Sequence, residues 1–254
     1  MFAVLASNIY GDSTVSSATS VTAIDFPGKV DIPTVTTSGT TVVVDWSAPN
    51  THYSAITAYD IKFLDSGSNL VTYTTGCTET AANVLSLTQC TVNMLDLNTQ
   101  LGLAVDTLIR VKVRAQNAKG WGSYSELNVG TATVETLPAV MSAPTIVSAS
   151  VTTTSIPLTW TVPTGSAAGG ASVSIISYDI EHSTDGTTWA TAVSATTGNT
   201  YTYTITASSS SHYFHIRATN KYGTQNTYSA SSVGVVGSAV PDKPDAPTVT
   251  LDGT

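Results

Sequence analysis

The residues that could carry acid–base or metal chemistry are few and scattered along this chain of 254 residues. The four histidines are His52, His182, His212 and His215. His212 and His215 stand three residues apart, so on one strand their side chains would point to opposite faces. No His-x-His or His-x-x-x-His pair supplies ligands at the spacing that zinc sites use. We therefore interpret the histidines as surface or half-buried structural residues and predict no metal site among them.

The spacing of the 17 carboxylates does not indicate a particular reaction either. Glycoside hydrolysis needs two carboxyl groups flanking one bond, and nothing in the spacing picks out such a pair. The stretch GSAAGG at 165–170 lacks the lysine and the following helix of a phosphate-binding loop. We predict that the chain is not an enzyme, with no catalytic residue and no cofactor.

Calcium is the remaining question for the carboxylates. Asp25 and Asp31 flank one proline-bearing joint, and Asp242 and Asp245 flank another. Carboxylates at joints could hold Ca²⁺ and stiffen an array. The clustered Asp, Asn and Glu signatures of dedicated calcium sites are missing, so we interpret these residues as solvated charges, with calcium binding as the open alternative.

Cys77 and Cys90 are the two cysteines of the chain and fall within one predicted domain. A disulfide closing a loop of that size would contribute roughly 3 kcal/mol to stability. Because no CxxC or histidine spacing suggests a metal, we predict a disulfide, which would favour an extracellular setting. A pair of buried reduced thiols is the alternative.

Trp121 is an aromatic residue outside the positions predicted for a core. It follows Gly120 in a loop, beyond the last position predicted for a core. Loops on a rigid scaffold often carry recognition. Either its ring covers the domain joint or the last strand, or it contacts a protein or sugar partner.

The composition indicates which kind of scaffold positions these residues. Apolar residues make up 41% of the chain, which is enough to fill cores and excludes a disordered chain. Charged residues are only 10%, and the abundant threonine suits a pleated strand. The net charge is −8 without a basic cluster, which argues against nucleic acid or an anionic membrane as a partner. No apolar run approaches the roughly 18–20 residues that span a bilayer, so we predict no membrane insertion in this segment.

Alternating apolar residues predict strands in two matching series. TTVVVDW at 40–46 and TSIPLTW at 154–160 each end in a tryptophan on the apolar face, Trp46 and Trp160. Further strands are expected at 56–63, 70–75, 89–95, 108–117 and 126–135, and again at 175–182, 187–193, 200–206, 212–220 and 229–237. Seven short strands in each series, with turns every 8–12 residues and no helix signal, predict an all-β chain of tandem Greek-key sandwiches.

A short motif, hydrophobe-x-Ala-x-Asn-x-x-Gly, occurs three times, around Ala6, Ala115 and Ala218. Together with the tryptophan on the second strand and Tyr-x-Ile on the third, it resembles fibronectin type III modules. The resemblance implies that the tryptophans fill the space between two sheets. It also implies that Asn117 and Asn220, with Gly120 and Gly223, shape the loop between strands F and G.

The chain departs from that family at one position. A tyrosine usually stands six residues before the alanine of the motif, and here Ile109 and His212 replace it. We expect the core to survive this change and the corner between strands E and F to differ.

The repeats predict the domain organisation. Residues 1–28 are expected to be strands F and G of a module, 29–138 and 139–240 two complete modules, and 241–254 the first strand of a further module. The chain would then be an excerpt of a longer array. Phe2 and Val4 align with apolar residues of the complete units, so we expect unseen parts of the same protein or neighbouring chains to cover them.

The function predicted from this organisation is that of a structural and adhesive segment. It would be a spacer and interaction scaffold in a long extracellular or cell-surface repeat protein or filament. Its partners would be other modules or neighbouring chains, with a glycan or protein as further ligand. The alternative is an accessory segment of a secreted polysaccharide-acting enzyme. A cytokine-receptor-like binder is a third reading, but GWGSYS at 120–125 is not the Trp-Ser-x-Trp-Ser motif that it would need.

Overall fold

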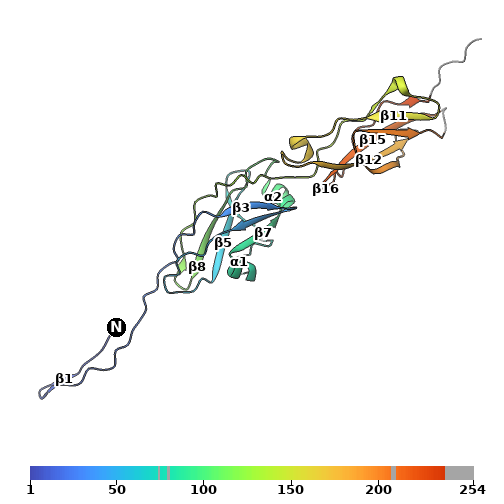
Figure 1. The fold of residues 1–254 in the computed structure, drawn as a ribbon. Helices are drawn as coiled ribbons and strands as arrows, with labels where there is room; N and C mark the ends of the chain where they lie inside the picture. The colour runs from blue at the N-terminus through green and yellow to red at the C-terminus, as the bar shows by residue number, and fades with distance from the viewer. Residues whose placement is uncertain (74, 79–80, 207–209, 238–254) are drawn as a thin grey trace, which may run out of the picture. The chain divides into compact units, whose positions relative to one another are not determined.

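The computed structural model describes residues 1–237 apart from 74, 79–80 and 207–209. The strand expected within 241–254, with Asp242 and Asp245, lies outside the described residues. The chain divides into two compact units, Met1–Val134 and Glu135–Thr254, called here the first unit and the second unit (Figure 1).

The first unit contains a sandwich of two antiparallel sheets. One sheet has the order β3-β4-β7 and the other β6-β5-β8-β9. The strands are β3 (Thr34–Ser38), β4 (Thr41–Asp45), β5 (Ala58–Leu64), β6 (Leu70–Thr72), β7 (Gln89–Asn93), β8 (Val111–Asn117) and β9 (Gly120–Trp121). Residues of β4 and β8 alternate between buried and partly exposed, as a strand with one face on a core requires.

The second unit repeats this arrangement. Its sheets have the orders β10-β11-β14 and β13-β12-β15-β16, and β17 also pairs with β15. The strands are β10 (Thr145–Ile146), β11 (Ser155–Thr159), β12 (Ile175–Ser183), β13 (Ala190–Thr196), β14 (Thr200–Thr204), β15 (Ser211–Asn220), β16 (Gly223–Thr224) and β17 (Val235–Val236). Two short 3₁₀ turns, Ser148–Ser150 and Gly165–Ala168, lie between strands.

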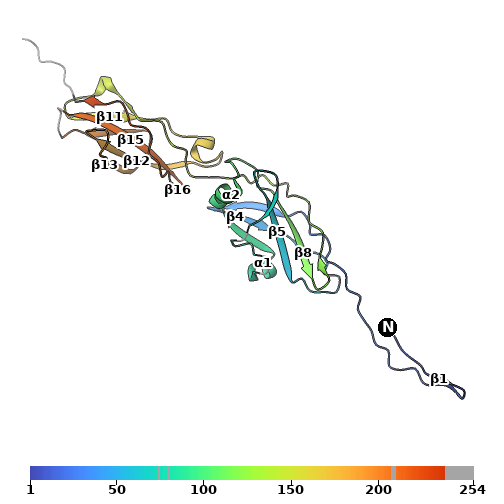
Figure 2. The ribbon, with the colours of Figure 1, turned by 180° about the vertical axis from the view of Figure 1, so that it is seen from behind.

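Both strand orders are those of the predicted Greek-key sandwich. Counted from β3 in the first sandwich and from β10 in the second, the first, second and fifth strands form one sheet, and the third, fourth, sixth and seventh form the other. This is the topology that the resemblance to fibronectin type III modules implies, so the predicted fold class is confirmed. The view from behind in Figure 2 shows the strands of the second sheet, β12, β13, β15 and β16, side by side.

The two predicted tryptophan anchors lie in the two cores. Trp46 is 6% exposed and its ring meets Tyr59 edge-on at 5.2 Å. Trp160 is 5% exposed and meets Tyr178 in the same way at 5.2 Å. Edge-on aromatic contacts of this kind add to the area that the rings bury, so each tryptophan fixes the packing of its second strand on its third.

The expectation of no helix was wrong for the first unit. Two short helices, α1 (Ala82–Leu87) and α2 (Met94–Leu101), flank β7. The predicted strand 89–95 ends at Asn93, because the Asn93 side chain accepts a hydrogen bond from the Leu95 N–H and starts α2. The helix then buries Met94, Leu97 and Leu101 and stops at Gly102 with a left-handed backbone.

The last strand of each sandwich is less regular than predicted. In the first unit, 126–135 forms no continuous strand, because side chains replace part of the ladder. Ser125 Oγ accepts a hydrogen bond from Val113 N at 3.1 Å, and Asn128 Oδ1 accepts one from Val111 N at 2.8 Å. In the second unit, β17 is the regular part of 229–237. The fourth strands also shift: 70–75 shortens to β6, and 187–193 moves to β13.

The first residues of the chain form a hairpin of β1 (Ser7–Asn8) and β2 (Gly11–Asp12). Its hydrogen bonds repeat the ladder between the last two strands of each sandwich. In all three places a hydrophobic residue donates its N–H to a serine Oγ at 3.0–3.1 Å, and the serine N–H returns a bond of 2.8–2.9 Å. The pairs are Val4–Ser16, Val113–Ser125 and Ile216–Ser229.

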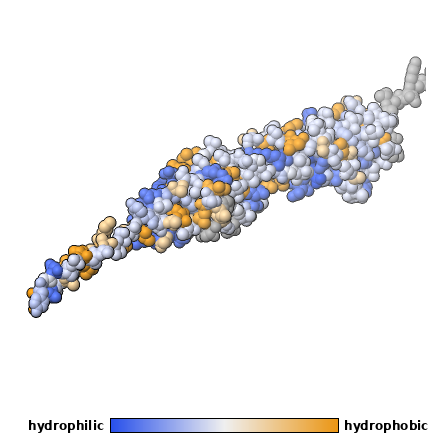
Figure 3. Space-filling model, turned by 60° about the horizontal axis from the view of Figure 1, so that its bottom comes forward, coloured by the Kyte–Doolittle hydropathy of each residue, from blue (hydrophilic) through white to orange (hydrophobic). Residues whose placement is uncertain are grey.

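The apolar face of this hairpin differs from its counterparts in exposure. Phe2 and Val4 are 71% and 72% exposed, whereas Val113 and Ile216 are fully buried. Figure 3 shows apolar atoms along the narrow hairpin and mostly neutral atoms over the sandwiches. Phe2 and Val4 therefore do not pack into either sandwich.

Neither helix combines the length and apolar character needed to cross a membrane within the residues that the structure describes.

Candidate functional site

The asparagine of the repeated motif fastens the segment that enters each sandwich. Asn117 Nδ2 donates to the carbonyl oxygens of Asp25 at 2.8 Å and Thr51 at 3.2 Å. Asn220 Nδ2 donates in the same way to Thr136 and Ala168, both at 2.8 Å. The motif thus joins three segments in each unit: the loop after the sixth strand, the loop after the second strand and the entering chain.

The glycine of the motif makes room for the same entering segment. Gly120 has φ +133°, which L side chains rarely adopt. A Cβ on Gly120 would stand 2.9 Å from a ring carbon of Phe26. Gly223 repeats the conformation with φ +128°, and a Cβ there would meet Leu137 at 3.3 Å. The implied role of this asparagine and glycine in shaping the loop therefore extends to holding the entering chain.

Glu135 adds a charged anchor at the start of the second unit. Its carboxylate is 4% exposed and accepts hydrogen bonds from Lys221, Ser172 and Tyr222. Burial raises the pKa of Glu135, but these three hydrogen bonds outweigh it and hold the pKa below its usual value. The group therefore stays ionised at neutral pH, where it ties the entering chain to two loops.

Trp121 lies on the outer face of the β6-β5-β8-β9 sheet. The Arg114 guanidinium stands 4.8 Å from the centre of the Trp121 ring and 4.4 Å from that of Tyr124. The same guanidinium pairs with the Asp60 carboxylate at 2.9 Å, and Tyr124 donates its hydroxyl to that carboxylate. Trp121 is partly exposed. Its contact with a partner stays a prediction.

The second unit carries the same cation–aromatic contact at the equivalent positions. Arg217 pairs with Asp179 at 3.1 Å and stands 4.5 Å from the centre of the Tyr228 ring. The sequence interpretation singled out Trp121 alone and missed that arginine, aspartate and tyrosine recur in both units. Alignment of the two motifs would have found it, since the arginine directly precedes the alanine in each.

A longer aromatic stack extends this face in the second unit. The His215 ring lies between Trp189 at 3.8 Å and Tyr228 at 4.1 Å, nearly parallel to both. His215 Nε2 also lies 2.7 Å from a Glu181 carboxylate oxygen. Burial and the Glu181 carboxylate raise the pKa of Tyr228 to about 12, so this tyrosine stays neutral and packs as an aromatic surface.

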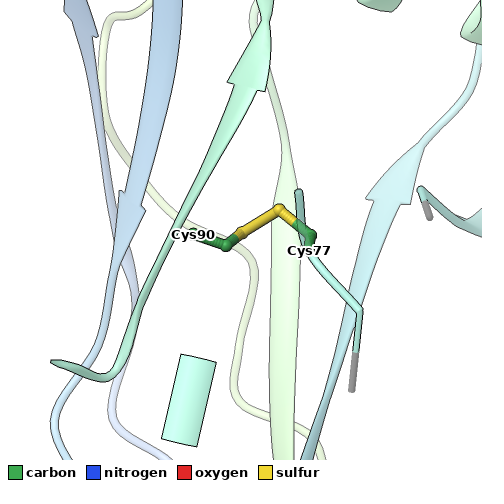
Figure 4. The surroundings of a disulfide bond; sticks show 2 residues. All are labelled: Cys77 and Cys90. Atoms are coloured by element: carbon green, nitrogen blue, oxygen red, sulfur yellow. A yellow bond between two sulfur atoms is a disulfide. The ribbon is translucent and has the colours of Figure 1, made fainter. Parts of the chain in front are cut away.

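The predicted disulfide between Cys77 and Cys90 is present (Figure 4). Both residues are buried, and their Cα atoms are 5.1 Å apart. The bond ties β7 to the segment that follows β6, across the edges of the two sheets. In the second unit Tyr201 takes the position of Cys90, and its hydroxyl donates to the Ala192 carbonyl of β13 at 3.1 Å. A hydrogen bond therefore makes the corresponding tie there.

The four histidines divide between surface and core. His52 lies in the loop after β4 with φ 46°. His215 points outward and His212 inward, as their spacing predicts. The sequence missed that His212 meets His182: the two rings are joined by a hydrogen bond of 2.8 Å inside the second unit. Strand register would have shown it, because His182 stands opposite Phe214, two residues from His212.

Of the candidate calcium ligands, Asp25 and Asp31 lie among the described residues. The Asp25 carboxylate accepts a hydrogen bond from Phe26 N at 2.8 Å. In the part of the chain that the structure describes, no three His, Cys, Asp or Glu side chains cluster as a metal site. Calcium binding at Asp25 and Asp31 is not proposed further.

No protein-family model and no curated protein matches this chain. Solved structures with similar chains include the FN1–FN3 domains of chicken CNTN1, which are 17% identical with a TM-score of 0.38 over 83% of this chain and 65% of that one. Domains A168–A170 from titin are 17% identical with a TM-score of 0.41 over 84% of this chain and 62% of that one. The chain thus spans less than two thirds of the length of each.

The fold assignment rests on the strand order and on the repeated motif with its fastening asparagine. These define the chain as tandem fibronectin type III-like modules.

Proposed function

We propose that the chain is a structural segment of an extracellular or cell-surface repeat protein, acting as a spacer and interaction scaffold and not as an enzyme. The observation that carries this proposal is the repeated fastening of the entering chain. Asn117 and Asn220 each donate two hydrogen bonds from the side-chain amide, one to a carbonyl of the entering linker and one to a carbonyl of a neighbouring loop. A module that holds its own entering linker in place restrains the movement of that linker, as a spacer in a chain of modules requires.

The proposed boundaries follow from the same pattern. Residues 29–138 and 139–240 are the two complete modules, and the last four residues of the first range, 135–138, serve as the linker that the second module holds. Residues 1–28 are strands F and G of another module. The exposed Phe2 and Val4 support the first assignment, because their counterparts in complete modules are covered by the opposite sheet.

An extracellular or cell-surface location is supported by the disulfide, which persists in oxidising compartments. The partners we propose are other modules of the same protein, neighbouring chains, or a protein ligand. The proposed contact is the face around Trp121, where the indole and the Arg114 guanidinium are both partly exposed. Tryptophan and arginine dominate the energetics of many protein interfaces.

Two measurements test this proposal. Stretching the chain between handles at its two ends should give one discrete unfolding event for each complete module. Release of the second should add about 350 Å, from roughly 100 residues at up to 3.6 Å each. A featureless extension would contradict the spacer role.

Location is tested on the natural protein. A membrane-impermeant amine reagent applied to intact cells of the source should label its lysines, and alkylation without reductant should leave Cys77 and Cys90 unmodified. Alkylated cysteines together with unlabelled lysines would place the protein inside the cell. Trp121→Ala should weaken any partner found by cross-linking on those cells, with Trp189→Ala as the matched control on the other module.

A further inference from the structure

A chain of titratable side chains lies inside the second unit. His182 Nε2 and His212 Nδ1 are 2.8 Å apart, and His182 Nδ1 lies 3.1 Å from the Tyr203 hydroxyl. The Tyr203 ring also stacks on His182, with ring centres 4.3 Å apart. His212 is 2% exposed. His182 and Tyr203 are partly buried and pack against the core residue Phe214. Imidazole at such positions can still gain a proton within the physiological pH range.

The first unit shows that this layer of the sandwich needs no polar group. Strand register places Phe63, Ile109 and Val92 at the positions of His182, His212 and Tyr203. All three are at most 1% exposed. Two modules of one topology therefore fill the same layer with three apolar side chains in one case and three titratable ones in the other.

The hydrogen bonds limit how many protons the two imidazoles can hold. A bond between two ring nitrogens needs one N–H and one free lone pair. One added proton is tolerated on His212, because its Nδ1 can then donate to His182 Nε2 while a neutral His182 donates from Nδ1 to the Tyr203 hydroxyl. A second added proton puts an N–H on each side of the 2.8 Å contact and two positive charges on adjacent rings, of which the His212 ring is buried and the His182 ring partly buried.

The residues paired with the two histidines do not supply charge. His182 stands opposite Ala190 of β13 and Phe214 of β15, and His212 stands opposite Val235 of β17. Tyr203 stands opposite Ile156 of β11. These partners are all apolar.

Among the described residues, the charged and titratable groups of β12, β14, β15 and the turn after β12 have the following partners. On β12 and β15 they alternate onto the outward face, in the pairs Glu181–His215 and Asp179–Arg217. The Asp185 carboxylate of the adjoining turn accepts hydrogen bonds from Ser183, Thr187 and Thr188. The Tyr201 hydroxyl of β14 donates to the Ala192 carbonyl.

We propose that the second unit is an acid-sensitive module: when both His182 and His212 are driven to accept a proton, their mutual hydrogen bond breaks and the sandwich opens at the layer where the first unit stays closed. The device would let acidification weaken one module of a tandem array selectively. It does not depend on the proposed spacer role, because it concerns the stability of one unit by itself.

The direction of the effect follows from linkage. Burial, and then the charge of His212, lower the pKa of His182. A histidine with a lowered pKa stabilises the folded state fully above about pH 6.5, the value of an unfolded chain, and loses that contribution as the pH falls through the folded pKa. While one proton is excluded, each pH unit below about 6.5 raises the unfolding constant roughly tenfold. Between pH 7.5 and 4.5 we expect an increase on the order of 100-fold for one excluded proton.

The test measures both units in one molecule. Amide hydrogen exchange of the whole chain, read by mass spectrometry and corrected for the intrinsic effect of pH, gives the opening of each unit from its own peptides. Peptides covering β4 and β8 report the first unit, and those covering β11 and β15 the second. We expect protection of the second unit to fall about 100-fold more than that of the first between pH 7.5 and 4.5.

Two variants separate the effect of the His182–His212 pair from that of the outward histidine, His215. His182→Phe, His212→Ile and Tyr203→Val together copy the trio of the first unit and should abolish the excess acid sensitivity. His215→Gln, which alters the outward stack, should keep it. The proposal is overturned if the two units respond alike to acid, or if the triple variant keeps the excess and His215→Gln removes it.

A measurement on the unaltered chain covers the case in which the triple variant fails to fold. Long-range proton–nitrogen correlation spectra report the protonation of each imidazole during an acid titration. We expect the His182 nitrogens to keep neutral shifts well below the pH at which a histidine in a short unstructured peptide titrates. Titration of His182 together with that peptide would overturn the proposal.

Discussion

Removal of the Cys77–Cys90 disulfide should destabilise the first unit and leave the second unit unchanged. The perturbation is Cys77→Ala with Cys90→Ala, which avoids placing two hydroxyls at positions that are 1% and 0% exposed. Reduction of the unaltered chain gives a second route to the same state. The bond acts on one unit because both cysteines lie within it.

The size of the effect follows from the loop that the bond closes. The cysteines are separated by 13 residues along the chain. The chain-entropy relation for a loop of this length gives about 3 kcal/mol at 25 °C. That corresponds to an increase in the unfolding constant on the order of 100-fold. With a urea dependence of about 1–3 kcal/mol per molar for a domain of this size, the midpoint should fall by roughly 1–3 M.

The assay must separate the two units, since each contains two tryptophans and fluorescence would mix them. A urea titration with brief deuterium pulses, read on peptides from β4 and β8 and from β11 and β15, gives two unfolding curves in one experiment. The curve of the second unit is the internal reference. A loss under about 1 kcal/mol in the first unit, or an equal loss in both, would refute the loop-entropy reasoning.

The second unit offers a matched comparison. Tyr201 stands where Cys90 does and ties its strand to β13 through one hydrogen bond to the Ala192 carbonyl. Tyr201→Phe removes that bond and should cost about 1 kcal/mol in the second unit alone. A larger loss for Tyr201→Phe than for the cysteine pair would mean that packing, and not the cross-link, sets the strength of this tie.

Three further predictions concern the cores and the entering segments. Trp46→Ala and Trp160→Ala should each cost about 3–5 kcal/mol in their own unit, measured by urea unfolding, and a loss under about 1 kcal/mol would contradict the burial of the rings. Asn117→Ala and Asn220→Ala should each lower the free energy of unfolding of their unit by about 2 kcal/mol, because two carbonyls lose their donor. Amide exchange in the entering segment should rise. Unchanged exchange there would show that other contacts hold the linker. Glu135→Gln should cost about 1 kcal/mol at pH 7. The difference from the unaltered chain should vanish as the pH falls through the lowered pKa of Glu135, since its stabilisation is complete above the pKa of an unfolded glutamate and is lost as the folded group gains its proton.

Alternation of apolar residues was sufficient to predict the strands that face a core. The sequence TTVVVDW places Val42, Val44 and Trp46 on one face, and all three are buried. A strand half covered by a sheet partner leaves this signal because its side chains alternate between core and solvent. The order of the strands then followed from the resemblance, and the structure bears it out.

Helix α2 escaped prediction because its apolar residues were assigned to a strand. Met94 follows directly on β7. In the sequence, the change from strand to helix periodicity is marked only by the helix cap at Asn93 and by Gly102 after the last turn. The last strand of each sandwich was overestimated for the opposite reason. There a serine or asparagine side chain takes the place of a backbone partner, so the ladder continues without regular strand geometry.

Contacts between residues far apart in the chain were beyond single-sequence reasoning. The His182–His212 hydrogen bond and the Arg114–Asp60 ion pair depend on the register between neighbouring strands of one sheet, which the alternation of apolar residues within each strand does not specify. The disulfide was predictable because two cysteines allow a single pairing.

The two sandwiches share one strand order but differ in the residues that join their strands. At the position where the first unit has Cys90, the second has Tyr201, and where the first has Phe63, the second has His182. Each exchange replaces a bond or contact of one chemical kind by another at the same place in the sandwich. The consequence is that a reductant should weaken the first unit and acid the second, although their topology is shared. Tandem repetition then adds more than length, because modules with the same fold can open under different conditions when a few core-facing side chains are changed.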